Sequence, residues 1–314
     1  MKQRRASLDR VTSHIRNLFH ISLWNDKTYK FKTDAAESYR SVYNESIVGL
    51  CSGKLLHADE TSVNVKGTNA YVWVLTSMEK VAYFYTPTRE SNVIQTLLAE
   101  FKGVLVSDFY TAYDAINCPQ QKCLIHFIRD LNDDLLKFPY DDGLKVLAKE
   151  FTELVKPMIE TVGKYGLKRR FLGKHRKFVD RFYKRLSGEF GHGEPVRKII
   201  ERLRRNRDTM FTFLNYDDVP WNNNNAEHAV KAFAKLREVI DGNTTVTGLR
   251  DYLVLLSICE TCKYKNVDFL EFLRSGSKNI DKFGKNPKKA LHVANGPQSL
   301  TDPTCSFTAP AISS

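Results

Sequence analysis

The stretch KLLHADETSVNVKGTNAYVWVLTSMEKVAYFYT, residues 54–86, decides the fold. It contains three short runs rich in β-branched and aromatic residues, at 54–65, 70–77 and 81–86. Residues typical of turns separate these runs, at 66–69 and 78–80. The pattern predicts an antiparallel meander of three strands.

The residues after this meander continue the sheet. Residues 90–101 have helical spacing, and GVLVSD (103–108) is a short apolar run bounded by glycine and aspartate, which indicates a strand buried on both faces. A short helix at 110–116, a strand at 122–125 and a helix from about residue 127 are expected next. Meander, helix, strand, helix, strand is the order of a ribonuclease-H-like core. We therefore predict an α/β fold, a mixed sheet flanked by helices.

A long basic segment interrupts this core. Residues from about 130 to 215 have helical periodicity, and residues 164–207 contain sixteen Lys or Arg against four acidic residues. Phe178, Phe182 and Leu186 are spaced by four, with Arg181, Lys184 and Arg185 between them, which predicts an amphipathic helix with a basic outer face. Such a face is often merely solvated. Because this segment follows a nuclease-like core, we expect instead a helical insertion whose basic face binds phosphate groups. The insertion would precede the last catalytic helix.

Charge and composition narrow the class of protein. The chain has 314 residues, 42 % of them hydrophobic, and a formal net charge of +12. A polyanionic partner explains that charge most simply, although a basic protein without a nucleic-acid role is the alternative. The basic N-terminus is not followed by an apolar signal core, and no apolar run approaches the roughly 18–20 residues that span a bilayer. We expect an intracellular protein without a membrane partner.

The six cysteines are too sparse and uneven for a disulfide framework. Cys259 and Cys262 form a CxxC motif inside an apolar stretch, and Cys123 and His126 form a CxxH motif with only Cys118 nearby. Structural zinc at either place is the alternative to the reduced, packed thiols that we expect.

Three segments are expected along the chain. Residues 1–50 are helical and polar, and their apolar residues Leu18, Phe19, Ile21 and Trp24 are expected to dock on the rest of the protein. Residues 51–275 form the catalytic domain with its insertion. Residues 276–314 form a flexible tail that contains Lys, Asn, Ser and Pro.

Asp59 is the first candidate for chemistry. Period-2 alternation places it on one face of its strand with Val63 and Val65, and places Glu60 on the other face, so we expect Asp59 rather than Glu60 to point inward. An inward carboxylate is costly unless a cation meets it. Either a buried Arg or Lys or a metal ion could supply that charge.

Two further carboxylates lie at positions where a site is expected. Asp108 closes the apolar strand, where α/β proteins place chemistry, although it could merely cap the next helix. Glu227 lies at the edge of the apolar stripe of a helix that begins within WNNNNAEHAVKAFAKL (221–236), although it could merely favour the helix dipole. Together with Asp59 they could hold two cations about 3.5–4 Å apart for phosphoryl transfer.

At these residues the sequence resembles the insertion-sequence-sixty-six-type bacterial DDE transposases. The resemblance lies in LLHADETSV, AYVWV, SDFYTAYDAI, KCLIHFIRDL, WNNNNAEHAVKAF and GLRDYLVLLSICETCKYKNVDFLEFL, which occur in family order over roughly residues 54–275. The N-terminal DNA-binding part usual in the family is expected to be missing.

The resemblance implies a ribonuclease-H-like fold and assigns Asp59, Asp108 and Glu227 as the catalytic, metal-binding triad. It implies two Mg²⁺ or Mn²⁺ ions per site, and DNA strand cleavage and transfer at transposon ends. Double-stranded DNA of transposon ends and target would be the partner, a homo-oligomer would assemble on it, accessory transposition proteins could assist, and the protein would be cytoplasmic and nucleoid-associated. Supporting or DNA-binding roles fall on residues in matching motifs: His126, Arg129, Asn223, Asn224 and Lys231.

Other functions stay open at this stage. The chain could be an inactive or truncated transposase remnant that acts only as a basic DNA-binding protein. A simple ribonuclease or junction nuclease on the same fold, and a zinc-organised structural protein, are further alternatives. Lys231 could form an ion pair with Glu227 instead of reaching phosphate, and His126 and Arg129 could serve packing instead of the scissile phosphate.

Overall fold

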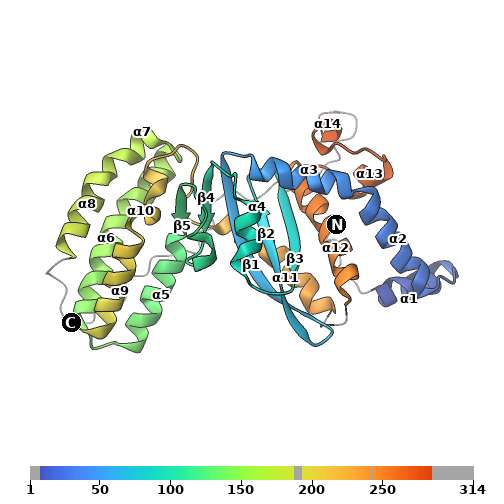
Figure 1. Ribbon diagram of the computed structural model, residues 1–314, viewed down its shortest axis with the longest axis horizontal. Helices are drawn as coiled ribbons and strands as arrows, with labels where there is room; N and C mark the ends of the chain where they lie inside the picture. Colours follow the sequence, from blue (N-terminus) through green and yellow to red (C-terminus); the bar gives the residue numbers. More distant parts are fainter. Residues whose placement is uncertain (1–7, 187–192, 241, 243, 285–314) are drawn as a thin grey trace.

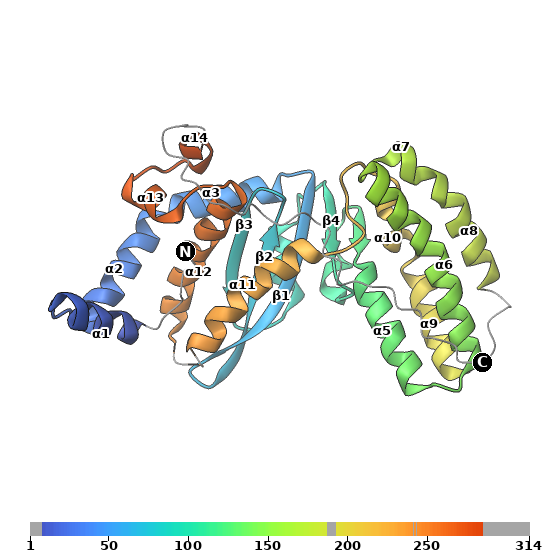
Figure 2. The same cartoon turned by 180° about the vertical axis from the view of Figure 1, so that it is seen from behind.

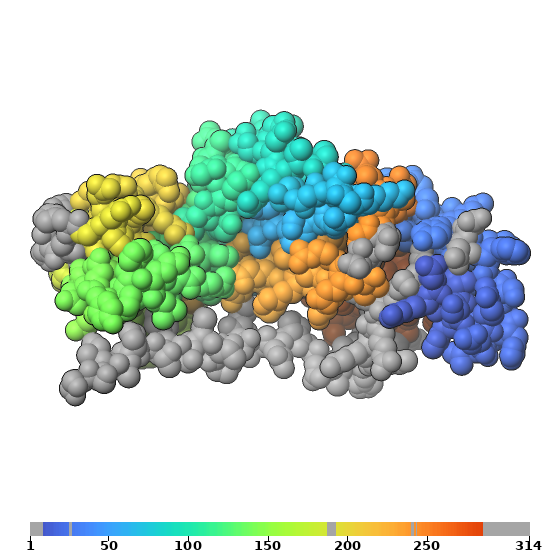
Figure 3. Space-filling model, turned by 90° about the horizontal axis from the view of Figure 1, so that it is seen from below, coloured from blue at the N-terminus to red at the C-terminus, as the bar shows by residue number. Residues whose placement is uncertain are grey.

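The computed structural model describes residues 8–186, 193–240, 242 and 244–284. A sheet occupies the middle of an elongated molecule, with a group of helices at one end and the N-terminal helices at the other (Figure 1). The space-filling view shows the same three parts following one another along the long axis (Figure 3).

The sheet has five strands in the order β3-β2-β1-β4-β5. Its members are β1 (Leu55–Val65), β2 (Thr68–Thr76), β3 (Val81–Thr86), β4 (Val104–Ser107) and β5 (Gln120–Lys122). β1, β2 and β3 pair antiparallel, whereas β1, β4 and β5 pair parallel. The predicted meander and the predicted mixed α/β sheet are therefore confirmed.

The turn between β1 and β2 is shorter than the sequence pattern predicts. Lys66 and Gly67 both have positive φ, 49° and 84°, and β2 starts at the next residue. A two-residue turn of this kind matches the right-handed twist of the paired strands, and glycine tolerates its conformation without strain.

Helices cover both faces of the sheet. On one face α3 (Arg40–Cys51), α4 (Ser91–Leu97) and the 3₁₀ helix η1 (Thr111–Tyr113) bury Leu56, Trp73 and Leu105. On the other face α11 (Asn224–Ile240) and α12 (Val246–Tyr264) bury Val63, Val72 and Val74 (Figure 2). Because both faces are covered, side chains on either side of a strand meet a protein interior.

The N-terminal helices pack on α12 at the end of the molecule. They are α1 (Leu8–Phe19), α2 (Asn25–Ser38) and α3. Residues of α2 and α3 share a core with α12, α13 (Phe269–Arg274) and α14 (Ile280–Gly284), and α1 packs on α2. The docking residues differ from those predicted: Leu18, Phe19, Ile21 and Trp24 are exposed, with Trp24 at 75 %. Ala36, Tyr39 and Val42 are buried instead, because the apolar side of α2 and α3 faces α12. The expected C-terminal tail begins with α14, and its remainder, 285–314, lies outside the described residues.

The predicted insertion is a bundle beyond the β4–β5 edge. Its helices are α5 (Leu124–Lys137), α6 (Asp142–Tyr165), α7 (Arg169–Leu172), α8 (Arg176–Arg185), α9 (Glu194–Arg205) and α10 (Arg207–Met210), with 3₁₀ turns η2 (Gly173–His175) and η3 (Thr212–Leu214). The expected strand 122–125 lies two residues earlier, and α5 begins at Leu124 because Cys123 is already its N-cap residue.

The insertion shares its hydrophobic core with the sheet. Val104 and Val106 of β4 lie in the same apolar cluster as Phe127 of α5 and Phe151 of α6. Phe127 is fully buried, and its ring centroid lies 4.8 Å from that of Phe151. The bundle therefore packs directly against β4, the strand that Asp108 follows.

None of the described helices is long and apolar enough to cross a membrane.

Replacing Phe127 with alanine tests this shared core. Because the ring is buried between sheet and insertion, we expect Phe127→Ala to lower the free energy of unfolding by about 3–5 kcal/mol, measured by urea denaturation. Phe138→Ala is the control. Phe138 is the C-cap residue of α5 and is 45 % exposed, so its replacement is expected to have a small effect on the free energy of unfolding. Equal losses in the two variants would contradict a core shared across this junction.

Candidate active site

Asp59 and Asp108 lie side by side on neighbouring parallel strands. The register of β1 and β4 pairs His57 with Val106, and continuing it by two residues places Asp59 level with Asp108. Asp59 lies on the same face of β1 as Val63 and Val65, which pack against α11. Its side chain therefore points to the face of the sheet that α11 covers.

The Asp59 carboxyl is held in an unfavourable environment for a negative charge. Burial is the main cause that raises its pKa, to about 7, and the nearby negative charges of Glu60, Asp108 and Glu227 raise it further. Only the backbone N–H of Glu60, which donates to Oδ1 at 2.9 Å, opposes these effects. Among the described residues, no Lys or Arg forms an ion pair with Asp59 or is a main cause of its pKa, so the buried cationic side chain considered for it is not found.

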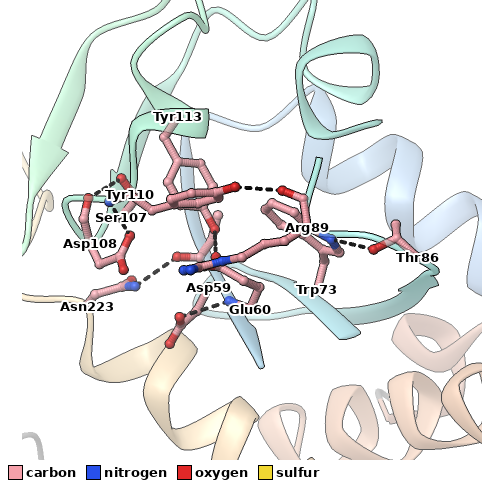
Figure 4. A network of polar contacts seen from close by, with 11 residues as sticks. Asp59, Glu60, Trp73, Thr86, Arg89, Ser107, Asp108, Tyr110, Tyr113 and Asn223 are labelled. Carbon is pink, nitrogen blue, oxygen red and sulfur yellow. Dashed lines mark hydrogen bonds and ion pairs between the residues drawn. The ribbon is translucent and has the colours of Figure 1, made fainter. Parts of the chain in front are cut away.

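Asp108 uses one carboxylate oxygen in a local turn. Its Oδ1 accepts the backbone N–H of Tyr110 at 2.9 Å, while no side chain caps η1 directly. Within the described part of the chain, no hydrogen bond occupies Oδ2. The turn thus fixes the carboxylate at the end of β4 and leaves one oxygen available for a ligand (Figure 4).

Glu227 lies in the first turn of α11, and the amide of Asn223 fixes that turn to β1. Asn223 is fully buried; its Nδ2 donates to the carbonyl of Ala58 at 2.9 Å, and its Oδ1 lies 3.0 Å from His57 Nδ1. Because the amide oxygen can only accept, His57 carries its proton on Nδ1. Complete burial lowers the pKa of His57 to about 4, so the ring is neutral. The side chain of Asn223 therefore tethers the helix start beside Asp59 instead of capping it.

The other asparagines at the start of α11 form further hydrogen bonds that hold this segment in place. Asn222 Oδ1 accepts the backbone N–H of Asn224 at 3.2 Å. Asn225 donates to the carbonyl of Ser77 at 2.8 Å and accepts from the hydroxyl of Tyr264 at 2.6 Å. Asn224 itself is half-buried and enters this network through its backbone. The asparagine-rich start of α11 is thus fixed to β1, to the β2–β3 turn and to α12.

Glu60 is buried, contrary to the outward orientation expected from alternation. Its side chain is 3 % exposed; Oε2 accepts from the hydroxyl of Tyr113 at 2.6 Å, and Oε1 accepts from Arg89. The guanidinium of Arg89 also stacks 3.9 Å from the ring centroid of Tyr110 (Figure 4). The prediction was wrong because helices cover the second face as well. The sequence signal that could have indicated the burial of Glu60 is the pair of adjacent acidic residues, Asp59 and Glu60, within one strand.

His126 and Cys123 lie beside Glu227, an arrangement that the sequence did not indicate. His126 Nδ1 is 3.9 Å from Glu227 Oε1, and both atoms are buried without a hydrogen-bond partner. Ligand atoms of Cys123, His126 and Glu227 all lie within 4.8 Å of one another. His126 is therefore beside Glu227, and Cys123 takes part in the same cluster.

The remaining predicted residues do not join this cluster. Arg129 and Lys231 are exposed, and among the described residues no ion pair joins Lys231 to Glu227. Arg181 and Lys184 are exposed on α8, which lies on the far side of the insertion from the sheet in both ribbon views (Figures 1 and 2). Arg185 forms an ion pair with Glu150 of α6, so its charge is used within the bundle.

The donor set suits a hard divalent cation. Carboxylates from β1, the end of β4 and the start of α11 interact electrostatically at Asp59. Arg89 also interacts with Asp108, but its ion pair is with Glu60. Glu227 Oε1 is buried and makes no hydrogen bond, as expected of an oxygen that can bind a cation. Carboxylate oxygens are the ligands that Mg²⁺ and Mn²⁺ prefer.

Replacing Asp59 tests the electrostatic environment without measuring activity. Because the folded-state pKa of about 7 lies above the ordinary value of 3.8, this group costs stability increasingly as pH rises from about 4 to 7. We expect Asp59→Asn to raise the melting temperature of the cation-free protein by a few degrees at pH 8, and by less at pH 5. Excess Mg²⁺ at pH 8 is expected to stabilise the wild type more than the variant. A variant less stable than the wild type at pH 8 without cations would contradict the crowding of negative charge at Asp59.

Comparisons with known proteins identify the family of the chain. A search of curated proteins gives no match. The model described as Transposase IS66 family matches residues 3–250, more than half of the chain, and includes all three carboxylates. The chain therefore belongs to the IS66 family of transposases.

Proposed function

We propose that this transposase is a DDE polynucleotidyl transferase whose catalytic carboxylates are Asp59, Asp108 and Glu227. The observation that carries the proposal is the position of Asp59 level with Asp108 on neighbouring parallel strands, on the face of the sheet that α11 and Glu227 cover. Both other carboxylates lie near enough to Asp59 to raise its pKa, to which burial contributes most. Carboxylates gathered in this way from distant parts of the chain are typical of sites that bind catalytic cations.

The topology supports a ribonuclease-H-like assignment of the fold. An antiparallel β1–β2–β3 meander is extended by parallel β4 and β5 on the other side of β1. This is the order that the sequence pattern predicts for such a core. The insertion between β5 and α11 leaves the core strands uninterrupted.

The proposed chemistry has two steps at one site. Two Mg²⁺ or Mn²⁺ ions bound there would supply Lewis-acid activation and charge stabilisation for phosphoryl transfer. Hydrolysis breaks a phosphodiester bond and leaves a 3′-hydroxyl on the DNA strand. The hydroxyl oxygen then forms a bond to a phosphorus of target DNA, while the 3′-oxygen bound to that phosphorus leaves. Asp59, Asp108 and Glu227 hold the cations, and Asn223 fixes the position of Glu227 relative to β1.

Double-stranded DNA is the proposed partner, and a basic hollow on the insertion supports it. Lys168, Arg169, Arg170, Gly173, Arg176 and Asp217 line this hollow, whose volume is about 680 Å³. Lys168 pairs with Asp218 at 2.9 Å, whereas within the described part of the chain no carboxylate lies within 4.0 Å of the guanidinium of Arg169, Arg170 or Arg176. Three uncompensated guanidiniums around one concavity suit phosphate oxygens. Because two transposon ends must be held at once, we also propose a homo-oligomer on DNA.

Replacing Asp108 tests the catalytic assignment. We expect Asp108→Asn to lower the rate of Mg²⁺-dependent cleavage of transposon-end DNA by roughly 100-fold or more, because it removes a ligand from a site worth several kcal/mol. DNA affinity, measured by fluorescence anisotropy, should stay unchanged. Asp133→Asn, at an exposed position of α5, is the matched control and should cleave normally. Near wild-type cleavage by Asp108→Asn would refute the triad. DNA binding by a wild type that never cleaves would favour an inactive remnant.

Neutralising the hollow tests the DNA partner. We expect the triple variant Arg169→Gln, Arg170→Gln, Arg176→Gln to bind DNA at least about tenfold more weakly at low salt. The slope of log affinity against log salt concentration should fall by roughly 1 for each phosphate that the variant no longer neutralises. The control replaces Lys145, Lys149 and Lys198 with Gln, which removes the same charge from cations already paired with acids on their own helices. Equal weakening by both variants would show a diffuse charge effect instead of a phosphate site.

A further inference from the structure

Three side chains with different donor atoms meet where α5 and α11 begin. Cys123 is the N-cap residue of α5, and His126 follows in its first turn. Glu227 lies in the first turn of α11. One ligand atom from each lies within 4.8 Å of the other two, which makes a sulfur, nitrogen and oxygen cluster. It is distinct in chemistry from the all-carboxylate set that we assign to catalysis.

Two atoms of this cluster lack partners. His126 Nδ1 and Glu227 Oε1 are buried and make no hydrogen bond. Their separation of 3.9 Å is too long for a direct hydrogen bond. Leaving a buried polar atom unpaired destabilises the fold. A bound group between the two atoms would remove that cost for both.

The sulfur of Cys123 is oriented by backbone donors. Burial raises the pKa of this thiol to about 11, and the backbone N–H groups of His126, Asn223 and Ile125 oppose that rise. The N–H of Asn223 donates to Sγ at 3.2 Å. N–H groups at the start of a helix stabilise negative charge on the sulfur, and a bound cation would complete the compensation. Burial and the nearby charge of Glu227 still raise the pKa of the thiol overall, so a thiolate ligand would form only when a bound cation displaces the proton.

We propose that Cys123, His126 and Glu227 form a binding site for a zinc-class divalent ion. Thiolate, imidazole and carboxylate are all zinc ligands, with bonds of about 2.0–2.3 Å, whereas Mg²⁺ does not favour sulfur. Tetrahedral geometry with such bonds places ligand atoms roughly 3.3–3.8 Å apart, so small side-chain rotations close the observed cluster around an ion. Water would fill the fourth position, and the thiol proton passes to solvent when the ion binds.

The site shares Glu227 with the proposed catalytic centre. An ion held by Cys123 and His126 would draw Oε1 away from the carboxylate set. We expect micromolar Zn²⁺ to inhibit Mg²⁺-dependent cleavage by the wild type and to inhibit Cys123→Ser much less. This consequence rests on the proposed function, whereas binding of the ion does not. Equal inhibition of both proteins would overturn the sharing of Glu227.

Cobalt(II) is the probe for the site itself, because its absorption spectrum reports thiolate ligation. The untagged full chain is titrated with Co²⁺ under reducing conditions. We expect thiolate-to-cobalt charge-transfer absorption that saturates at one ion per chain and disappears when Zn²⁺ is added. Cys123→Ser should abolish the charge-transfer band, and His126→Gln should weaken binding by at least about tenfold. Absence of the band in the wild type, or its persistence in Cys123→Ser, would overturn the proposal.

Matched controls separate this site from other thiols and from catalysis. Cys51→Ser and His228→Gln change a cysteine at the end of α3 and an exposed histidine beside Glu227, and both should keep the cobalt spectrum. Asp59→Asn should also keep the spectrum while it loses cleavage. Loss of the spectrum in Asp59→Asn would show that the ion binds at the carboxylate set and would overturn the assignment. A wild type that binds cobalt but never cleaves DNA would refute the proposed function alone.

Discussion

The hydrogen bonds of a single buried amide determine where the start of α11 lies. Asn223 joins β1 through the carbonyl of Ala58 and the ring of His57, and its backbone N–H reaches Cys123 at the start of α5. All three partners are buried, so each bond is made in a medium where an unpaired donor or acceptor would be costly. An entire helical bundle separates β5 from α11 in the sequence, yet the side chain of Asn223 binds the start of α11 to β1, the strand that bears Asp59. The position of Glu227 relative to Asp59 depends on these hydrogen bonds.

The double covering of the sheet explains why two adjacent acidic residues have different environments. Asp59 faces α11 and lies near further carboxylates. The protein therefore places other negative charges close to a buried carboxylate, which raises the pKa of Asp59. Glu60 faces η1, forms an ion pair with Arg89 and accepts a hydrogen bond from Tyr113. A buried carboxylate with its own cation is satisfied by the protein alone, whereas one without a cation is stabilised only by an added ion. Within one strand, Glu60 has its own cationic partner and serves the fold, whereas Asp59 has none and is a proposed cation ligand.

The sheet could be predicted from the sequence because its strands and turns have local signals, whereas the grouping of the three carboxylates followed from the resemblance to the family. Alternation and turn residues indicated the meander, and a short apolar run ending in an acid indicated β4 and Asp108. Features that depend on contacts between distant segments were not predictable in this way. The burial of Glu60 requires knowledge of the second helical layer, and the pairing of Arg185 with Glu150 requires knowledge of how α6 and α8 pack. The exposed Leu18 and Trp24 illustrate the same limit, since amphipathic spacing does not specify which neighbour a helix meets.

Glu227 lies at the boundary between two donor sets, and this position links the insertion to the carboxylates. On one side are the oxygens of Asp59 and Asp108, which suit hard cations; on the other are Cys123 and His126 of α5, which suit softer ones. The helix that bears Cys123 and His126 is also the first helix of the insertion, and its Phe127 lies in the core shared with β4. The N-terminal end of α5 therefore lies beside Glu227 while its Phe127 packs in the core of the insertion and β4. Under the proposed function, α5 is the element of the insertion that lies next to the third carboxylate.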